Sequence, residues 1–156
     1  MNTMQVRLWS LKNVLLLYFV KPRVLEVSER RCVVKIPLNW RTKNHLHSMY
    51  FGALCIGADV TGGLIAFHLA REAKTPISFV FKDMKASFLK RAEGDVVFTN
   101  NDGGVVQDLM RRTFETGERQ EATVRVVATV PSKLGDEPVA QFDMTLSIKK
   151  VEKRPK

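Results

Sequence analysis

The stretch that decides the fold is residues 50–70, YFGALCIGADVTGGLIAFHLA, which consists almost wholly of apolar and small residues. A run of this length and composition predicts one long helix that is buried inside the protein. Asp59 is the exception in its middle, because burying an unpaired carboxylate costs on the order of several kcal/mol. Two interpretations remain open. Asp59 lies on an exposed stripe or accepts a hydrogen bond from a neighbour such as Thr61, or it is an ionisable group of a functional site.

The residues before this helix favour the functional interpretation. They form a polar loop, residues 41–48, and Ser48 is the predicted N-cap of a helix that begins near Met49. Backbone N–H groups at a helix start point outward with the positive end of the dipole behind them, which suits an anion or a carbonyl oxygen that gains negative charge. Gly52, in the first turn, would let a ligand approach the backbone closely.

The same segment resembles the motif of a known family. Hotdog-fold acyl-CoA thioesterases of the phenylacetate-degradation type carry Asn, five residues, His-Gly-Gly, six residues, Asp or Glu, three residues, and Gly. In NHLHSMYFGALCIGADVTGG these positions hold Asn44, Tyr50, Phe51, Gly52, Asp59 and Gly63. Tyr50 stands where the family usually has His, and Phe51 replaces the first Gly. The phrase FLKRAEGDV at residues 88–96 also resembles the family, so the resemblance covers residues 23–151 and indicates a divergent, mostly uncharacterised branch.

The resemblance implies an α+β hotdog fold, in which an antiparallel sheet wraps around one long central helix, here with an added N-terminal helix. It implies hydrolysis of the thioester of an acyl-CoA or acyl-carrier-protein, with coenzyme A present as part of the substrate and no separate cofactor. Hotdog proteins form homodimers or homotetramers with the active site between two subunits. By this resemblance Asp59 would face Asn44 and Gly52 of the second copy.

The resemblance also implies a role for each site residue. The N–H of Gly52, with that of Phe51, would stabilise the negative oxygen that forms during thioester hydrolysis. Asp59 would act as general base on a water or as a nucleophile that forms a mixed anhydride, and the sequence does not choose between them. Asn44 would orient the water or the carbonyl, or else stabilise a loop turn. Tyr50 would donate its hydroxyl to the thioester or pack under the acyl chain.

The net charge of +9 raises the question of a polyanionic partner. The basic residues are spread from Arg7 to Lys156, and the sequence contains no zinc-finger spacing, RNP-like phrase or Gly-rich phosphate loop, so we expect no nucleic-acid partner. Lys90 and Arg91 are the candidate contacts for the phosphates of coenzyme A, with a solvated strand end as the alternative.

The histidines do not predict a metal site. His45 and His47 could share an ion, but only His68 remains as a third histidine, and no CxxC or HExxH pattern exists.

The two cysteines do not have the spacing of a disulfide-bonded framework and favour a reducing compartment, so we expect a cytoplasmic protein. With 156 residues and 45% hydrophobic content, the chain is expected to form one domain over residues 1–156.

The apolar run at residues 14–20, VLLLYFV, is too short to span a bilayer, so we expect no transmembrane segment. Leu8, Leu11, Leu15 and Tyr18 or Phe19 recur at helical spacing, which predicts an amphipathic N-terminal helix within residues 1–21 that packs on the sheet. A helix that lies on a membrane surface is the alternative.

The remaining pattern predicts strands at residues 23–28, 31–37, 77–88, 95–99, 121–130 and 139–151, a second helix at 103–116 and a basic tail at 149–156. Strands 77–88 and 95–99 are expected to pair across the AEGD turn, and residues 132–138 to form the last turn.

The site residues and the resemblance leave two functions. The first is thioester hydrolysis with Asp59 as base or nucleophile. The alternative is a non-catalytic acyl-CoA or lipid-binding module, which Tyr50 and Phe51 favour.

Overall fold

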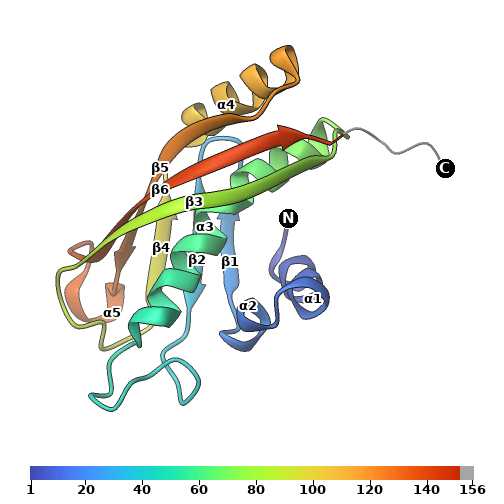
Figure 1. Ribbon diagram of the computed structural model, residues 1–156. Coiled ribbons are helices and arrows are strands. Elements are labelled where there is room, and N and C mark those ends of the chain that lie inside the picture. Colours follow the sequence, from blue (N-terminus) through green and yellow to red (C-terminus); the bar gives the residue numbers. More distant parts are fainter. Residues whose placement is uncertain (152–156) are drawn as a thin grey trace.

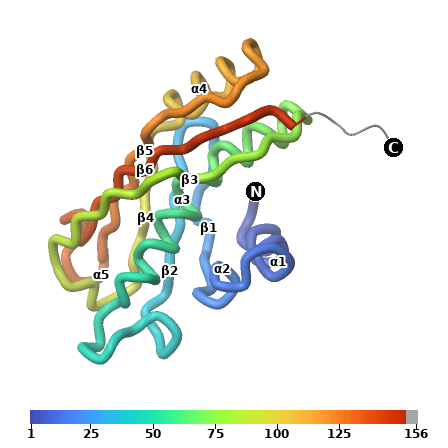
Figure 2. Tube along the Cα trace, viewed as in Figure 1, coloured from blue at the N-terminus to red at the C-terminus, as the bar shows by residue number. Residues whose placement is uncertain are grey.

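One long helix runs along a six-stranded antiparallel sheet in the computed structural model, which describes residues 1–151 (Figures 1 and 2). The strands are β1 (Arg23–Val27), β2 (Cys32–Ile36), β3 (Ile77–Phe88), β4 (Val96–Asn100), β5 (Gln120–Thr129) and β6 (Pro138–Lys150). The helices are α1 (Thr3–Asn13), α2 (Leu15–Phe19), α3 (Phe51–Glu72), α4 (Gly103–Thr116) and α5 (Pro131–Leu134). The strand order is β1-β2-β4-β5-β6-β3, so β1 and β3 are the two edges. The predicted α+β architecture is confirmed.

The core helix is α3. Its small and apolar residues face β2, β4 and β5, and Ala58, Ile65 and Ala66 are fully buried. Gly57 allows this close approach, because a Cβ at its position would overlap the ring of Phe98 in β4. Among residues 1–151, α3 is the one helix long and apolar enough to cross a bilayer, but 67% of its most apolar stretch is buried within the fold. Its hydrophobicity therefore matches a helix that packs inside a sheet.

The expected pairing of residues 77–88 with 95–99 is wrong. β3 pairs with β6 along its whole length, from Ile77 opposite Lys150 to Phe88 opposite Ala140. β4 lies in the middle of the sheet, between β2 and β5. The segment that joins β3 to β4 crosses the ends of the strands, and the N–H of Leu89 donates to the carbonyl of Val139. Local turn residues mark a change of direction, but they do not select the partner of a strand.

The predicted N-terminal helix forms in two pieces. α1 ends at Asn13 and α2 begins at Leu15, because Val14 between them adopts a non-helical backbone, with φ −145° and ψ 89°. Asn2 caps α1 by accepting a hydrogen bond from the N–H of Gln5 at 3.0 Å. Both helices contact α3 or β1, so they cover one side of the core helix (Figure 1).

The orientation of these two helices also differs from expectation. The residues predicted to pack on the sheet, Leu8, Leu11, Leu15 and Phe19, are exposed, and Tyr18 is half-buried. The buried residues are Val6, Ser10, Leu17 and Val20. The segment is apolar on more than one side, so helical spacing alone does not indicate which side faces inward. Ser10 is tolerated on the inner side because its hydroxyl donates to the carbonyl of Val6 at 2.8 Å.

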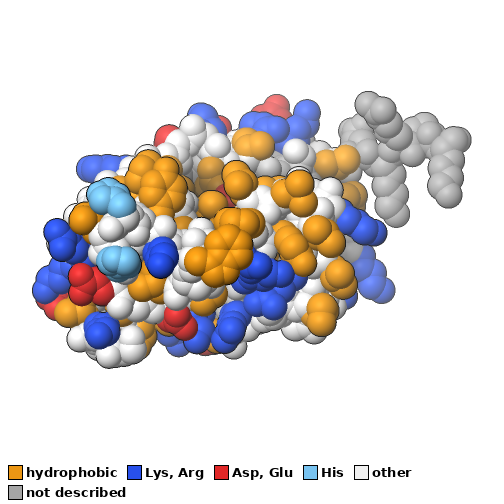
Figure 3. Space-filling view, turned by 90° about the horizontal axis from the view of Figure 1, so that it is seen from below, with side chains coloured by type: hydrophobic (Ala, Val, Ile, Leu, Met, Phe, Trp, Pro, Cys, Tyr) orange, Lys and Arg blue, Asp and Glu red, His pale blue; other side chains and the backbone are white. Residues whose placement is uncertain are grey.

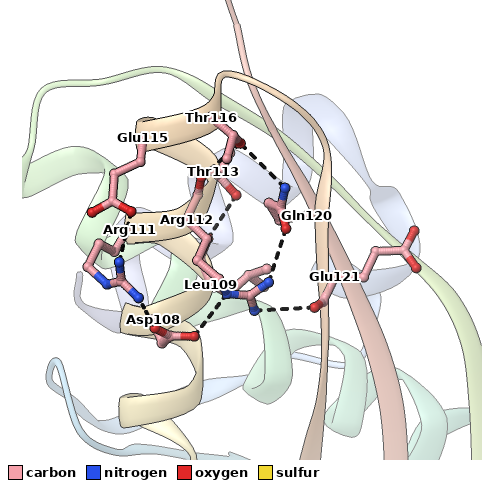
Figure 4. A network of polar contacts seen from close by, with 9 residues as sticks. All are labelled: Asp108, Leu109, Arg111, Arg112, Thr113, Glu115, Thr116, Gln120 and Glu121. Atoms are coloured by element: carbon pink, nitrogen blue, oxygen red, sulfur yellow. Dashed lines mark hydrogen bonds and ion pairs between the residues drawn. The ribbon is translucent and has the colours of Figure 1, made fainter.

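The second predicted helix is confirmed as α4. It buries Val106, Leu109 and Met110 against the sheet. On its outer side the guanidinium of Arg112 binds Asp108 within the helix at 2.9 Å and Gln120 of β5 at 3.0 Å (Figure 4). These polar contacts hold α4 along β5.

Two predicted boundaries differ at the end of the chain. The expected turn at residues 132–138 overlaps the short helix α5, which begins one residue earlier at Pro131, and proline suits the first position of a helix. The expected basic tail at 149–156 begins inside β6, since Lys149 pairs with Ser78 and Lys150 with Ile77. Its residues 152–156 lie outside the described residues.

Candidate functional site

The loop before α3 is organised by Asn44. Its side-chain oxygen accepts hydrogen bonds from the N–H groups of Leu46 at 2.9 Å and Ser48 at 3.2 Å. The hydroxyl of Ser48 lies 3.2 Å from the Asn44 amide nitrogen. The prediction that Ser48 caps α3 is therefore wrong, because this hydroxyl is engaged within the loop. The N-cap is Tyr50, which makes no side-chain cap hydrogen bond, and the helix begins at Phe51.

The start of α3 presents free backbone donors beneath an aromatic ring. Within residues 1–151, neither the N–H of Phe51 nor that of Gly52 donates a hydrogen bond. The ring of Tyr50 lies over Gly52, since a Cβ at Gly52 would overlap this ring. Tyr50 and Phe51 stack at 4.8 Å between centroids, and Phe51 meets Phe88 of β3 edge to face at 6.2 Å. The glycine does allow close approach, and in this chain the approaching group is Tyr50.

A groove of about 530 Å³ runs beside this helix start. The predicted site residues that line it are Asn44, Tyr50, Phe51, Lys90 and Arg91. Lys90 forms an ion pair with Glu137, and Arg91 is exposed. The structure thus brings five of the seven predicted site residues together, with Gly52 next to them.

Asp59 lies elsewhere, two turns further along α3. It lies seven positions after Gly52, which is about 10 Å along a helix. It lines a second cavity of about 620 Å³ between α1, α2, α3 and β3. The wall of this cavity is mainly apolar and includes Val6, Trp9, Leu17, Phe67, Phe79 and Phe81.

The carboxylate of Asp59 is unsatisfied and half-buried. It forms no hydrogen bond or ion pair with any residue in the range 1–151, and Thr61 donates its hydroxyl to the carbonyl of Gly57 instead, at 2.7 Å. Burial raises the pKa of Asp59 above that of an ordinary aspartate. Burial also raises the pKa of the neighbouring Cys55 thiol, which disfavours a thiolate there. Among the described residues, Asp59 and Arg71 are the two charged side chains that line this cavity, and a guanidinium stays protonated, so Asp59 is the side chain that fits proton transfer.

Sequence reasoning missed the cavity wall. Trp9 and Phe67 meet edge to face at 5.2 Å, and Phe67 meets Phe79 at 4.8 Å. The alternation of Phe79 and Phe81 in β3 was a signal that both face α3. Trp9 gave no such signal, because it becomes part of the cavity wall only when α1 folds back over α3.

The histidines do not converge. His45 and His47 are exposed in the loop before α3, while His68 lies 3.4 Å from Glu72 one turn later in the helix. Within residues 1–151, no three His, Cys, Asp or Glu side chains come together as a possible metal site.

Solved structures share this fold over nearly the whole chain. A protein of unknown function from Pseudomonas aeruginosa, described as a probable thioesterase, superposes with a TM-score of 0.78 at 20% identity over 97% of each chain. A protein of unknown function from Chlorobaculum tepidum gives 0.82 at 10% identity, over 96% of this chain and 94% of that one. A thioesterase from Haemophilus influenzae gives 0.72 at 12% identity, over 100% and 96%. The molecule has the hotdog fold that these structures share.

Within that fold class, the chain belongs to the family described as a domain of unknown function (DUF4442), which matches residues 13–148. No curated protein matches the chain. The hotdog architecture expected from residues 44–63 is thereby confirmed, and the phenylacetate-degradation subtype stays a prediction.

Proposed function

We propose that this protein hydrolyses acyl thioesters, with Asp59 as the general base or the nucleophile. The observation that carries the proposal is a carboxylate that has no partner among residues 1–151 on the wall of a mainly apolar cavity, where burial raises its pKa. Ionisable groups whose pKa is shifted by burial in a cavity cluster at functional sites. Thioesterases among the solved structures of the same fold support this reaction class.

The chemistry divides between the two parts of α3. The acyl group occupies the apolar cavity, and the free N–H groups of Phe51 and Gly52 stabilise the oxygen that gains charge. Asp59 then either removes a proton from the attacking water or adds to the thioester carbonyl to form a mixed anhydride. In the first route the proton that Asp59 takes from water passes to the leaving thiolate. In the second route the thiolate leaves as the anhydride forms and takes a proton from water, and a water molecule then hydrolyses the anhydride to release the acid and regenerate Asp59.

The site requires a second copy of the chain. Asp59 and Gly52 are about 10 Å apart on one helix, whereas reacting groups must approach to about 3–3.5 Å. The edge strand β3 has no neighbour on its outer side in the described sheet, and it exposes Val80, Met84 and Phe88. We place a partner's β3 on this edge, which makes a dimer, with a tetramer as the larger alternative. The helix start of one subunit would then complete the site around Asp59 of the other.

The groove at the helix start suits the coenzyme A part of the substrate. Arg91 and Lys90 offer positive charge for its phosphates, with Lys90 exchanging its exposed partner Glu137 for the ligand. Tyr50 and Phe51 offer aromatic surface, and acyl-carrier-protein is the alternative carrier. Coenzyme A belongs to the substrate, and the proposal needs no separate cofactor or metal. Two free cysteines suit the cytoplasm, where we place the activity.

The test is thiol release from short-, medium- and long-chain and aryl acyl-CoAs, with wild type and Asp59→Asn side by side. Asp59→Asn should lower turnover by roughly 10²–10⁴-fold, the usual contribution of a general base. The exposed Asp136→Asn is the matched control and should keep full activity. Unchanged turnover in Asp59→Asn would rule out the role of Asp59.

A non-catalytic acyl-binding module is the second candidate. It is favoured by the ring of Tyr50 over Gly52 and by the side-chain oxygen of Asn44, which is occupied by donors of its own loop. The same substrate panel separates the two candidates. Binding of acyl-CoA without turnover on any member would support the module.

A further inference from the structure

The outer side of the two N-terminal helices is a continuous apolar surface. It consists of Leu8, Leu11, Leu15, Leu16 and Phe19, which we call the leucine face. These side chains are between 45% and 66% exposed. In the view from below, hydrophobic side chains gather over this part of the molecule with Lys and Arg side chains among them (Figure 3). An exposed apolar surface of this kind marks an interaction site.

The leucine face continues into an aromatic cluster of the loop after β2. Trp40 is 70% exposed and meets Phe19 edge to face at 6.0 Å. The guanidinium of Arg41 lies 4.8 Å from the ring centroid of Trp40 and 5.6 Å from that of Phe19. Tryptophan beside arginine is typical of the boundary between lipid and water, because both side chains combine apolar surface with a polar tip.

The two segments that carry this surface contain charge of one sign. Residues 1–25 and 37–50 contain no Asp or Glu. The basic residues of these two segments are Arg7, Lys12, Lys21, Arg23, Arg41 and Lys43. Asp95 borders the second segment, where it accepts a hydrogen bond from the N–H of Leu38 at 2.9 Å and forms an ion pair with Lys35. Apolar side chains bordered mainly by positive charge complement a lipid surface that carries negative headgroups.

The same charges disfavour a second copy as the occupant. A symmetric contact through the leucine face would bring the basic residues that border it in one copy, Lys12, Lys21 and Arg41, near the basic residues that border it in the other. Like charges that meet in this way cost free energy and oppose association. An anionic lipid surface offers apolar volume and opposite charge together.

We propose that α1, α2 and the Trp40 loop dock this protein on the surface of an anionic lipid bilayer. The leucine face enters the boundary between headgroups and acyl chains, and Lys12, Lys21 and Arg41 lie at headgroup level. The inner side of the same helices, through Val6 and Trp9, lines the cavity that contains Asp59. Docking therefore places this cavity next to lipid. The docking does not depend on thioester hydrolysis.

The experiment is flotation of the full chain with vesicles of phosphatidylcholine alone or mixed with phosphatidylglycerol. Wild type should float with the anionic vesicles, and rising salt should release it. The double variant Leu15→Ser/Leu16→Ser should lower the partition coefficient on anionic vesicles by about tenfold or more. Lys12→Ala should lower it by about fivefold on anionic vesicles and leave neutral vesicles unaffected.

Matched controls come from other surfaces. Val105→Ser changes an exposed apolar residue of α4, at the other end of the molecule from α2, and Lys133→Ala changes an exposed lysine of α5. Both should float as wild type does. The proposal is overturned if wild type fails to float with anionic vesicles, or if the controls lose as much binding as the leucine variant. It is also overturned if the leucine variant floats normally and changes only its oligomeric state, since a second copy would then cover the face.

Discussion

The loop before α3 and the middle of the helix differ in whether their polar side chains have hydrogen-bond partners. At the helix start Asn44 and Ser48 satisfy each other and hold the loop in one shape. Two turns later Asp59 has no partner among residues 1–151, and burial disfavours its charge. Asn44 and Ser48 have a structural role, because their hydrogen bonds hold the loop. Within the described part of the chain, Asp59 stabilises no contact of this kind, and we therefore assign the chemistry to Asp59 and positioning to the loop.

The sharpest way to test this division is a mixed dimer. Asp59→Asn and Gly52→Phe are each expected to be inactive alone, since one lacks the carboxylate and the other fills the space over the helix start. A purified dimer that contains one chain of each should recover about half of wild-type activity, because one of its two sites is intact. An inactive mixed dimer would mean that Asp59 and Gly52 of the same chain work together.

A smaller change at the helix start asks whether Tyr50 must stay over Gly52. Gly52→Ala adds a Cβ that overlaps the ring of Tyr50, so the ring has to turn away. We expect kcat/KM for acyl-CoA hydrolysis to change by about tenfold, while the melting temperature stays the same or rises, since Ala favours helix over Gly. Gly104→Ala in the first turn of α4 is the control, because nothing lies within 4 Å of its added Cβ. Equal effects of both substitutions would contradict a special role for the Tyr50 contact.

Stability should reveal the unsatisfied charge of Asp59 through its pH dependence. The pKa of Asp59 is raised in the folded protein, so both folded and unfolded states are protonated at low pH and no penalty exists there. As pH rises through the raised pKa, the folded state loses stability that Asp59→Asn retains. Melting curves from pH 4 to pH 8 should show an advantage of the variant that grows with pH, by roughly 2–4 °C for each kcal/mol. An advantage that shrinks with pH would show that the charged form is stabilised.

The weakest expected effect is at the mouth of the groove. Arg91→Ala should raise the KM for acyl-CoA by about threefold at low salt and leave kcat unchanged, because an exposed charge contributes little and is screened. Lys90→Ala should do less, since Lys90 already pairs with Glu137. A KM for Arg91→Ala equal to that of wild type at low salt would remove Arg91 from the coenzyme A site.

Local pattern was sufficient for most of the elements. The apolar run at residues 50–70 became α3, and residues 103–116 became α4 with the predicted bounds. Asn44, Tyr50 and Phe51 are close in the sequence, and they line one groove in the structure, as predicted. These features depend on neighbours along the chain, which a sequence displays directly.

Contacts between distant segments were not predictable in this way. The pairing of β3 with β6 instead of β4 depends on which long-range ladder buries more apolar surface. The leucine face points outward because Val6 and Leu17 take the inner positions, and helical spacing fits either choice. The cavity around Asp59 needs α1, α3 and β3 together, so its wall residue Trp9 could not be identified from the sequence.

The edge position of β3 has a consequence for handling the protein. A strand of twelve residues with one side unpaired offers its backbone groups to any extended segment, including those of unfolded chains. When a second copy takes this edge, folding becomes linked to mass action, and the melting temperature rises with protein concentration. Dilution would expose the edge again, so the fraction of molecules with a free β3 edge should be largest in dilute, partly dissociated samples.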